Sequence, residues 1–166
     1  MYVIGIDPGI TGAVAFLPPP GNGVFGFAVN VIDLPVYQDG KHQMINAVKL
    51  ASILRSWYQT PGLDLLNTDI MVYVEQVSAM PGQGVAGMFN FGTSYGIILG
   101  VVGALGMPLT LVRPQAWKKR AGLLHREKDE ARTLAQRLYP QIDLSRKKDI
   151  GRADAILIAR FGSETG

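Results

Sequence analysis

The sequence predicts an α/β domain built around a mixed sheet. Strand-like runs come before the first helical pattern, and strands and helices then alternate. The early runs, at residues 2–7, 12–17 and 24–34, are apolar or β-branched, and glycine- and proline-containing turns separate them. Because short loops join them, we expect an antiparallel meander, followed by parallel strands and flanked by helices.

The later elements follow from the spacing of their apolar residues. From Gln43 to Tyr58 these residues recur three and four positions apart, which predicts an amphipathic helix. The run IMVYVE at residues 70–75 has the length and composition of a buried strand. The remaining helices are expected just after Pro114, at 128–138 and at 151–161.

One apolar region is long enough to cross a bilayer. Residues 76–112 contain no charged residue and no histidine. Many glycines make the region only mildly apolar, so we expect a buried helix at about 88–105 and a buried strand at 109–113, with no membrane contact. Three glycines would line one face of that helix, packed on the sheet or on a second copy of the chain: Gly92, Gly96 and Gly100.

Composition limits the class of protein. With 166 residues, 48% of them hydrophobic, we expect a single domain over residues 1–166. The chain has no cysteine, which excludes disulfides and thiolate metal sites and fits the cytoplasm. Residues 113–166 hold 13 Lys and Arg against 7 Asp and Glu. This basic part, with Trp117 inside RPQAWKKR, indicates contact with nucleic acid, the alternative being solvated helix faces.

Three acidic residues interrupt apolar runs. Asp7 ends the first strand, Glu75 ends the strand at 70–75, and Asp154 breaks the apolar face of the last helix. An unpaired carboxylate at the edge of the core is costly, and a salt bridge or helix cap would explain any one of them. Three together fit hard divalent cations better. Two Mg²⁺ or Mn²⁺ ions bound by Asp7 and its partners would clamp the attacking water and leaving oxygen of a phosphodiester.

At these residues the sequence resembles the RuvC-type Holliday junction resolvases of the RNase H-like superfamily, especially their phage-encoded members. The resemblance rests on GIDPGITGAVA at 5–15, VYVEQ at 72–76, PQAWKK at 114–119 with Lys128, and GRADAILIA at 151–159. It implies an RNase H-like five-stranded mixed sheet and a homodimeric, metal-dependent endonuclease. Such an enzyme makes paired nicks in a four-way DNA junction.

The resemblance also implies roles for single acids. Asp7, Glu75 and Asp154 match the catalytic carboxylates of the family. A fourth acid is expected three residues before Asp154, but Gly151 occupies that position and the nearest acid is Asp149. Asp149 is therefore expected either to join the metal site from a loop or to cap the last helix or pair with the basic run before it.

The DNA-contacting residues are expected on both sides of the acids. Lys118 and Lys128 match basic positions that lie beside the scissile phosphate in the family. Phe89 and Phe91, with Met88, occupy the region where family members place an apolar wedge near the junction centre. Further phosphate contacts are expected at Lys119, Arg146, Lys147 and Lys148.

Three other functions are compatible with parts of this pattern. Another RNase H-like nuclease would share the carboxylates but act as a monomer on duplex or hybrid substrates. An actin-like nucleotide-binding module also begins with a strand, an Asp and a glycine turn, but 166 residues are too few for its two lobes. A non-catalytic DNA-binding protein would have no reason to direct three acids at a polyanion.

Overall fold

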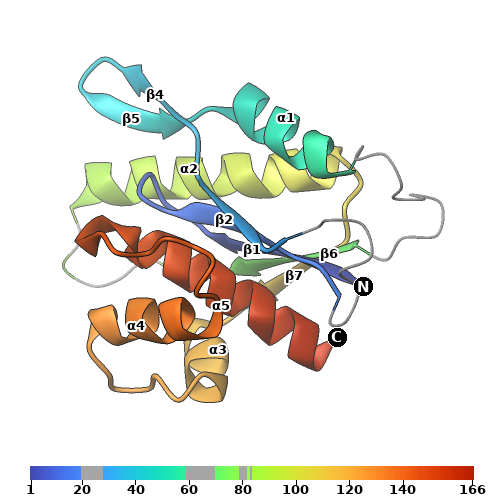
Figure 1. Cartoon of the computed structure of the whole chain (residues 1–166). Helices are drawn as coiled ribbons and strands as arrows, with labels where there is room; N and C mark the ends of the chain where they lie inside the picture. Colours follow the sequence, from blue (N-terminus) through green and yellow to red (C-terminus); the bar gives the residue numbers. More distant parts are fainter. Residues whose placement is uncertain (20–27, 59–69, 79–81, 83) are drawn as a thin grey trace.

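A five-stranded mixed sheet forms the centre of the computed structural model, which describes residues 1–19, 28–58, 70–78, 82 and 84–166 (Figure 1). The strand order is β3-β2-β1-β6-β7. The strands are β1 (Tyr2–Asp7), β2 (Ala13–Leu17), β3 (Asn30–Asp33), β6 (Ile70–Glu75) and β7 (Leu109–Val112). β1, β2 and β3 pair antiparallel, and β1, β6 and β7 run parallel. The predicted α/β class is confirmed; part of its third strand, residues 24–27, lies outside the described residues.

A short hairpin that the sequence did not predict stands beside this sheet. β4 (Val36–Asp39) pairs antiparallel with β5 (His42–Ile45), and Asp39 lies opposite His42. The connection is therefore a two-residue turn, and Gly40 adopts a positive φ of 58° there. The hairpin extends from the same side of the sheet as α1 and α2 (Figure 1).

The predicted helix from Gln43 to Tyr58 is wrong in its first turn, because these residues belong to β5. The observed helix, α1, runs from Ala47 to Tyr58. Its start is set by Asn46, whose side-chain oxygen accepts a hydrogen bond from the backbone N–H of Lys49 at 3.0 Å. An asparagine in this position caps a helix N-terminus. The helix therefore begins after Asn46, and the residues before it belong to the hairpin.

Helices cover both faces of the sheet. α1 and α2 (Val85–Ala104) lie on one face, and α3 (Pro114–Arg120), α4 (Lys128–Leu138) and α5 (Ile150–Thr165) lie on the other (Figure 1). α5 packs directly on β1: a Cβ added at Gly5 would lie 2.3 Å from the carbonyl oxygen of Ala155. Only glycine permits this approach, which brings the start of α5 over the end of β1.

The helix expected to be buried at about 88–105 is largely exposed. Its buried residues are Ser94, Ile98 and Val102. A Cβ added at any of the three glycines in its stripe would meet nothing within 4 Å, so this stripe does not pack on the sheet. By length and composition, α2 is the one helix of the described ranges that is apolar enough to cross a membrane. Core helices of soluble proteins meet the same criterion. For the glycine stripe of α2, the prediction that remains is a contact with a second copy of the chain.

The strand expected to be buried at 109–113 is an edge strand. β7 pairs only with β6 in the described sheet, and its sole buried residue is Val112. Leu109 and Leu111 are 37% and 43% exposed. The prediction of a buried strand is therefore wrong: β7 is apolar, but at the open edge of the described sheet most of it is exposed.

Candidate active site

Three elements bring the acids that the sequence singled out to one end of the sheet. β1 and β6 are parallel neighbours with Ile6 opposite Val74, so Asp7 and Glu75, the next residues of each strand, lie at the same end of the sheet. α5 crosses β1 at this edge and carries Asp154 in its second turn. All three side chains are partly buried. The structure thus brings together the ends of β1 and β6 and the first half of α5.

The electrostatics show that these carboxylates interact. Burial, followed by repulsion from Asp154 and Glu75, raises the pKa of Asp7 to about 8. Burial and the charge of Glu75 raise the pKa of Asp154 to about 7. Lys118 opposes both shifts, and Lys128 opposes the shift of Asp154. The two lysines therefore lie on the same side of the molecule as the acids.

The donor set suits a hard divalent cation. It consists of carboxylate oxygens alone, and their mutual repulsion and burial are costs that a bound cation relieves. In the described ranges, no three histidine, cysteine or acidic side chains stand close enough together to form a ready-made ligand group. The three acids are close enough for their charges to raise one another's pKa, as for Asp7 and Asp154, but they do not form a preassembled ligand group in the described residues.

Glu75 has a fixed partner that the sequence analysis assigned to another role. The indole nitrogen of Trp117 donates a hydrogen bond to Oε1 of Glu75 at 2.9 Å. Trp117 is fully buried, so its ring faces the core and is closed to nucleic-acid bases. The inference that Trp117 marks a DNA-contacting surface is wrong for this residue. The basic residues around Trp117 in the sequence indicate an exposed segment, so the burial of Trp117 could not be predicted. Its role follows only from its contact with Glu75.

A groove of about 560 Å³ begins at Glu75, the one of the three acids that lines it. Glu75, Phe91 and Lys118 line it together with residues that were not predicted as site residues, some of which belong to the quoted motifs: Gln76, Val77, Ser78, Arg113, Pro114 and Gln115. Arg113 is exposed and precedes the proline that begins α3. The sequence does not show that these residues share one groove, because the groove forms only where β6, α2 and α3 meet.

Gly151 explains why the fourth acid is missing from its expected position. A Cβ there would lie 2.4 Å from the carbonyl oxygen of Thr11 and 3.1 Å from Oδ2 of Asp7. Any side chain would therefore collide with the β1–β2 turn. Glycine at this position therefore allows the start of α5 to approach Asp7 and the turn that follows it.

Asp149 is held by a basic neighbour. Its carboxylate is 1% exposed and accepts hydrogen bonds from Nη2 of Arg146 at 2.7 Å and from the Arg146 backbone N–H at 3.0 Å. Arg146 holds the pKa of Asp149 below its ordinary value. The structure thus favours the ion-pair alternative, and metal binding by Asp149 stays a prediction that requires this pair to open.

Comparison with known proteins defines the fold. No protein-family model matches the chain. Over 92 residues it is 37% identical to the chloroplastic Holliday junction resolvase MOC1 of Chlamydomonas reinhardtii, a match that covers 54% of this chain and 10% of the relative. The chain thus matches about a tenth of that protein's length.

Solved structures match along the whole chain. The structure of Thermus thermophilus RuvC aligns with a TM-score of 0.58 at 22% identity, covering 100% of this chain and 97% of the other. T. thermophilus RuvC in complex with a Holliday junction substrate aligns with a TM-score of 0.62 at 16% identity and the same coverage. The chain has the RuvC fold. The predicted architecture, a mixed five-stranded sheet flanked by helices, is confirmed.

Within this RuvC fold, the predicted DNA-contacting residues differ in exposure. Phe89 on α2 is 74% exposed, whereas Phe91 is partly buried and lines the groove. Of the cations predicted to contact phosphates, Lys118 is partly buried, and the others are exposed: Lys119, Lys128, Arg146, Lys147 and Lys148. The guanidinium group of Arg146 is engaged by Asp149, so it is less available to a phosphate than the sequence suggested.

Proposed function

We propose that this chain is a metal-dependent endonuclease that cuts four-way DNA junctions. The observation that carries the proposal is the group of three interacting carboxylates, Asp7, Glu75 and Asp154, at one sheet edge beside two lysines. A phosphodiester carries a negative charge, so it can approach the carboxylates only if bound cations lie between them. Lys118 and Lys128 can contact the phosphate directly. The named activity of the curated relative and the junction-bound RuvC structure support this substrate.

The proposed roles of the residues follow from their charges. Asp7, Glu75 and Asp154 would hold two Mg²⁺ or Mn²⁺ ions, with Asp149 as a candidate fourth ligand. When bound, such ions lower the pKa of water and stabilise the charge that develops on a phosphodiester. Lys118 and Lys128 supply fixed positive charge beside the scissile phosphate. The buried neighbours of Asp7 exclude bulk water and keep these charges effective.

We further propose that the chain forms a single nuclease domain and that it acts as a homodimer. A four-way junction has approximate two-fold symmetry, so paired nicks need two sites related by a two-fold axis. α2 offers the surface: it is long, apolar and exposed, and its open glycine stripe allows a second helix to approach closely. Phe89, near its start, is placed to act as the wedge at the junction centre. Cytoplasmic location remains the expectation from composition.

The proposed substrate can be tested with strand-labelled DNA. The protein is incubated with a four-way junction, a flap, a linear duplex and an RNA–DNA hybrid of matched sequence, with Mg²⁺, Ca²⁺ or EDTA. We expect Mg²⁺-dependent, symmetrically placed nicks in the junction, at least about tenfold faster than in duplex, a difference of about 1.4 kcal/mol in barrier. Equal cutting of duplex or hybrid would instead indicate a general RNase H-like nuclease. Cutting in EDTA would exclude the metal-dependent mechanism.

A further inference from the structure

The hydrogen bond between Trp117 and Glu75 connects the core to the candidate metal site. Trp117 is on α3 and Glu75 ends β6, 42 residues earlier in the chain. A buried indole N–H needs an acceptor, and the acceptor here is a carboxylate oxygen at 2.9 Å. Hydrogen bonds to a charged acceptor are stronger and more directional than neutral ones. The contact therefore restrains the side-chain orientation of Glu75.

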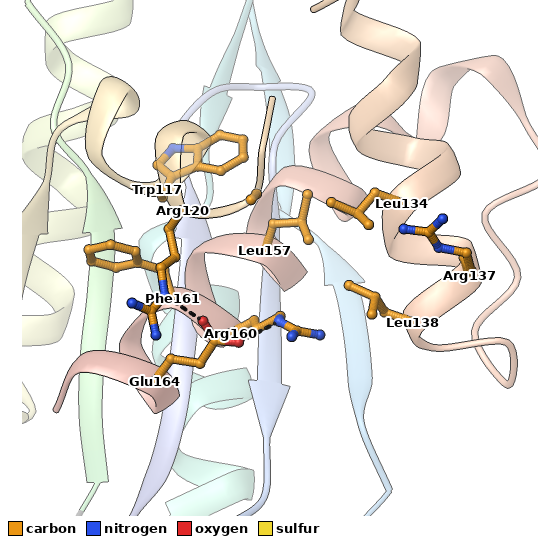
Figure 2. Close-up of a pocket in the computed structure, with 10 residues that line it drawn as sticks. Trp117, Arg120, Leu134, Arg137, Leu138, Leu157, Arg160, Phe161 and Glu164 are labelled. Atoms are coloured by element: carbon orange, nitrogen blue, oxygen red, sulfur yellow. Dashed lines mark hydrogen bonds and ion pairs between the residues drawn. The ribbon is translucent and has the colours of Figure 1, made fainter. Parts of the chain in front are cut away.

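The ring that makes this bond is itself held in place. Trp117 forms one wall of a cavity of about 240 Å³ between α3, α4 and α5, together with Leu157 and Phe161 (Figure 2). Lys118 places its ammonium group 5.2 Å from the centre of the indole ring. One rigid side chain thus contacts both an acid and a base of the proposed site.

We infer that Trp117 is a positioning residue: its indole N–H holds Oε1 of Glu75 and thereby fixes the orientation of a carboxylate that would bind the metal ion. This inference rests on the proposed function. It is distinct from a purely structural role for a large core residue, because it assigns the effect to one N–H group. Partners that orient a ligand in this way commonly change metal affinity by about tenfold or more.

Two matched variants separate the hydrogen bond from core packing. Trp117→Phe keeps an aromatic ring but removes the N–H donor. Trp57→Phe is the control: Trp57 stacks on Phe16, with ring centroids 3.6 Å apart, and belongs to the core on the opposite face of the sheet. Both substitutions shorten a packed aromatic side chain, so both are expected to lower the melting temperature in EDTA.

The deciding readout is metal binding by the DNA-free protein. Isothermal titration with Mn²⁺ should show at least about tenfold weaker binding for Trp117→Phe and unchanged binding for Trp57→Phe. The Mg²⁺ concentration for half-maximal cleavage should rise in parallel. Unchanged metal affinity in folded Trp117→Phe would overturn the inference. If wild-type protein binds neither ion, the proposed metal centre fails as well, so the two failures are distinguishable.

A second measurement applies even if Trp117→Phe does not fold. The chain has two tryptophans, so Trp57→Phe leaves the Trp117 indole N–H as a single resonance in a ¹H–¹⁵N spectrum. We expect this resonance to shift when Mg²⁺ is added. The shift should be lost in the Trp57→Phe/Glu75→Gln double variant. A resonance that responds to neither Mg²⁺ nor the change at Glu75 would overturn the inference.

Discussion

Replacing Asp7 with asparagine should stabilise the metal-free protein while it removes activity. The folded state raises the pKa of Asp7 from 3.8 to about 8, through burial and through repulsion from Asp154 and Glu75. The folded protein therefore binds this proton more tightly than the unfolded chain does. As pH rises from about 4 toward 8, the unfolded state gains more from ionisation, and wild-type stability should fall. Asp7→Asn carries no such titration.

The size of the effect follows from the difference in pKa. At pH 7 the pH lies above the pKa of 3.8 that Asp7 has in the unfolded chain. Keeping Asp7 protonated in the folded protein at this pH therefore costs wild-type protein at most about 4 kcal/mol of stability. At pH 4.5 the corresponding limit is about 1 kcal/mol. A gain of about 2 kcal/mol would raise the melting temperature by about 4–8 °C for a chain of this size.

The assay is urea and thermal unfolding in EDTA at pH 4.5 and pH 7. We expect Asp7→Asn to exceed wild type in stability at pH 7 and to approach it at pH 4.5. Added Mg²⁺ should narrow the gap at pH 7, since the ion stabilises only the wild-type carboxylate. If Asp7→Asn is less stable than wild type at pH 7, or equally stable at both pH values, the electrostatic account of the site is refuted.

Three further variants test other parts of the molecule. Asp149→Asn should lower the free energy of unfolding by about 2 kcal/mol at pH 7, because it removes a charged partner of Arg146. Arg146 holds the pKa of Asp149 below its usual value of 3.8 in the folded state, so this loss should shrink as pH falls below that value, which urea unfolding at pH 7 and pH 3 will check. Lys128→Ala should weaken junction binding and reduce its log–log salt slope by about 0.9; an unchanged slope would indicate a solvated lysine. Gly96→Arg points into open space and should fold normally but give a monomeric mass by light scattering, whereas a retained dimer would exclude α2 as the interface.

The sequence was sufficient for the acids because each interrupts an apolar run where an element ends. Asp7 and Glu75 are the last residues of two strands rich in β-branched residues, and the parallel pairing of these strands brings their ends together. Asp154 breaks the apolar face of a helix that packs on β1. Such local contrasts between a charge and its neighbours are visible in sequence because burial of a carboxylate requires compensation.

The remaining features depend on contacts between distant segments. Residues 42–45 form a strand because of the turn at Gly40 and the cap at Asn46, although their apolar spacing also fits a helix. The apolar composition of α2 predicts that the helix is buried. Composition does not show whether the residues that bury it belong to the same chain or to a second copy. Trp117 sits among charged residues in sequence, and its partner Glu75 is 42 residues away.

The most direct test of the account is single-turnover cleavage of a four-way junction by Asp7→Asn, Glu75→Gln and Asp154→Asn, with binding measured on the same samples. We predict that each variant cuts at least about a hundredfold more slowly, equivalent to about 2.7 kcal/mol of barrier, and binds the junction as tightly as wild type or more tightly. The control is Asp33→Asn, which removes an exposed acid paired with Arg152 and should cut normally. Cleavage near the wild-type rate by any of the three carboxylate variants would contradict the assignment of this site.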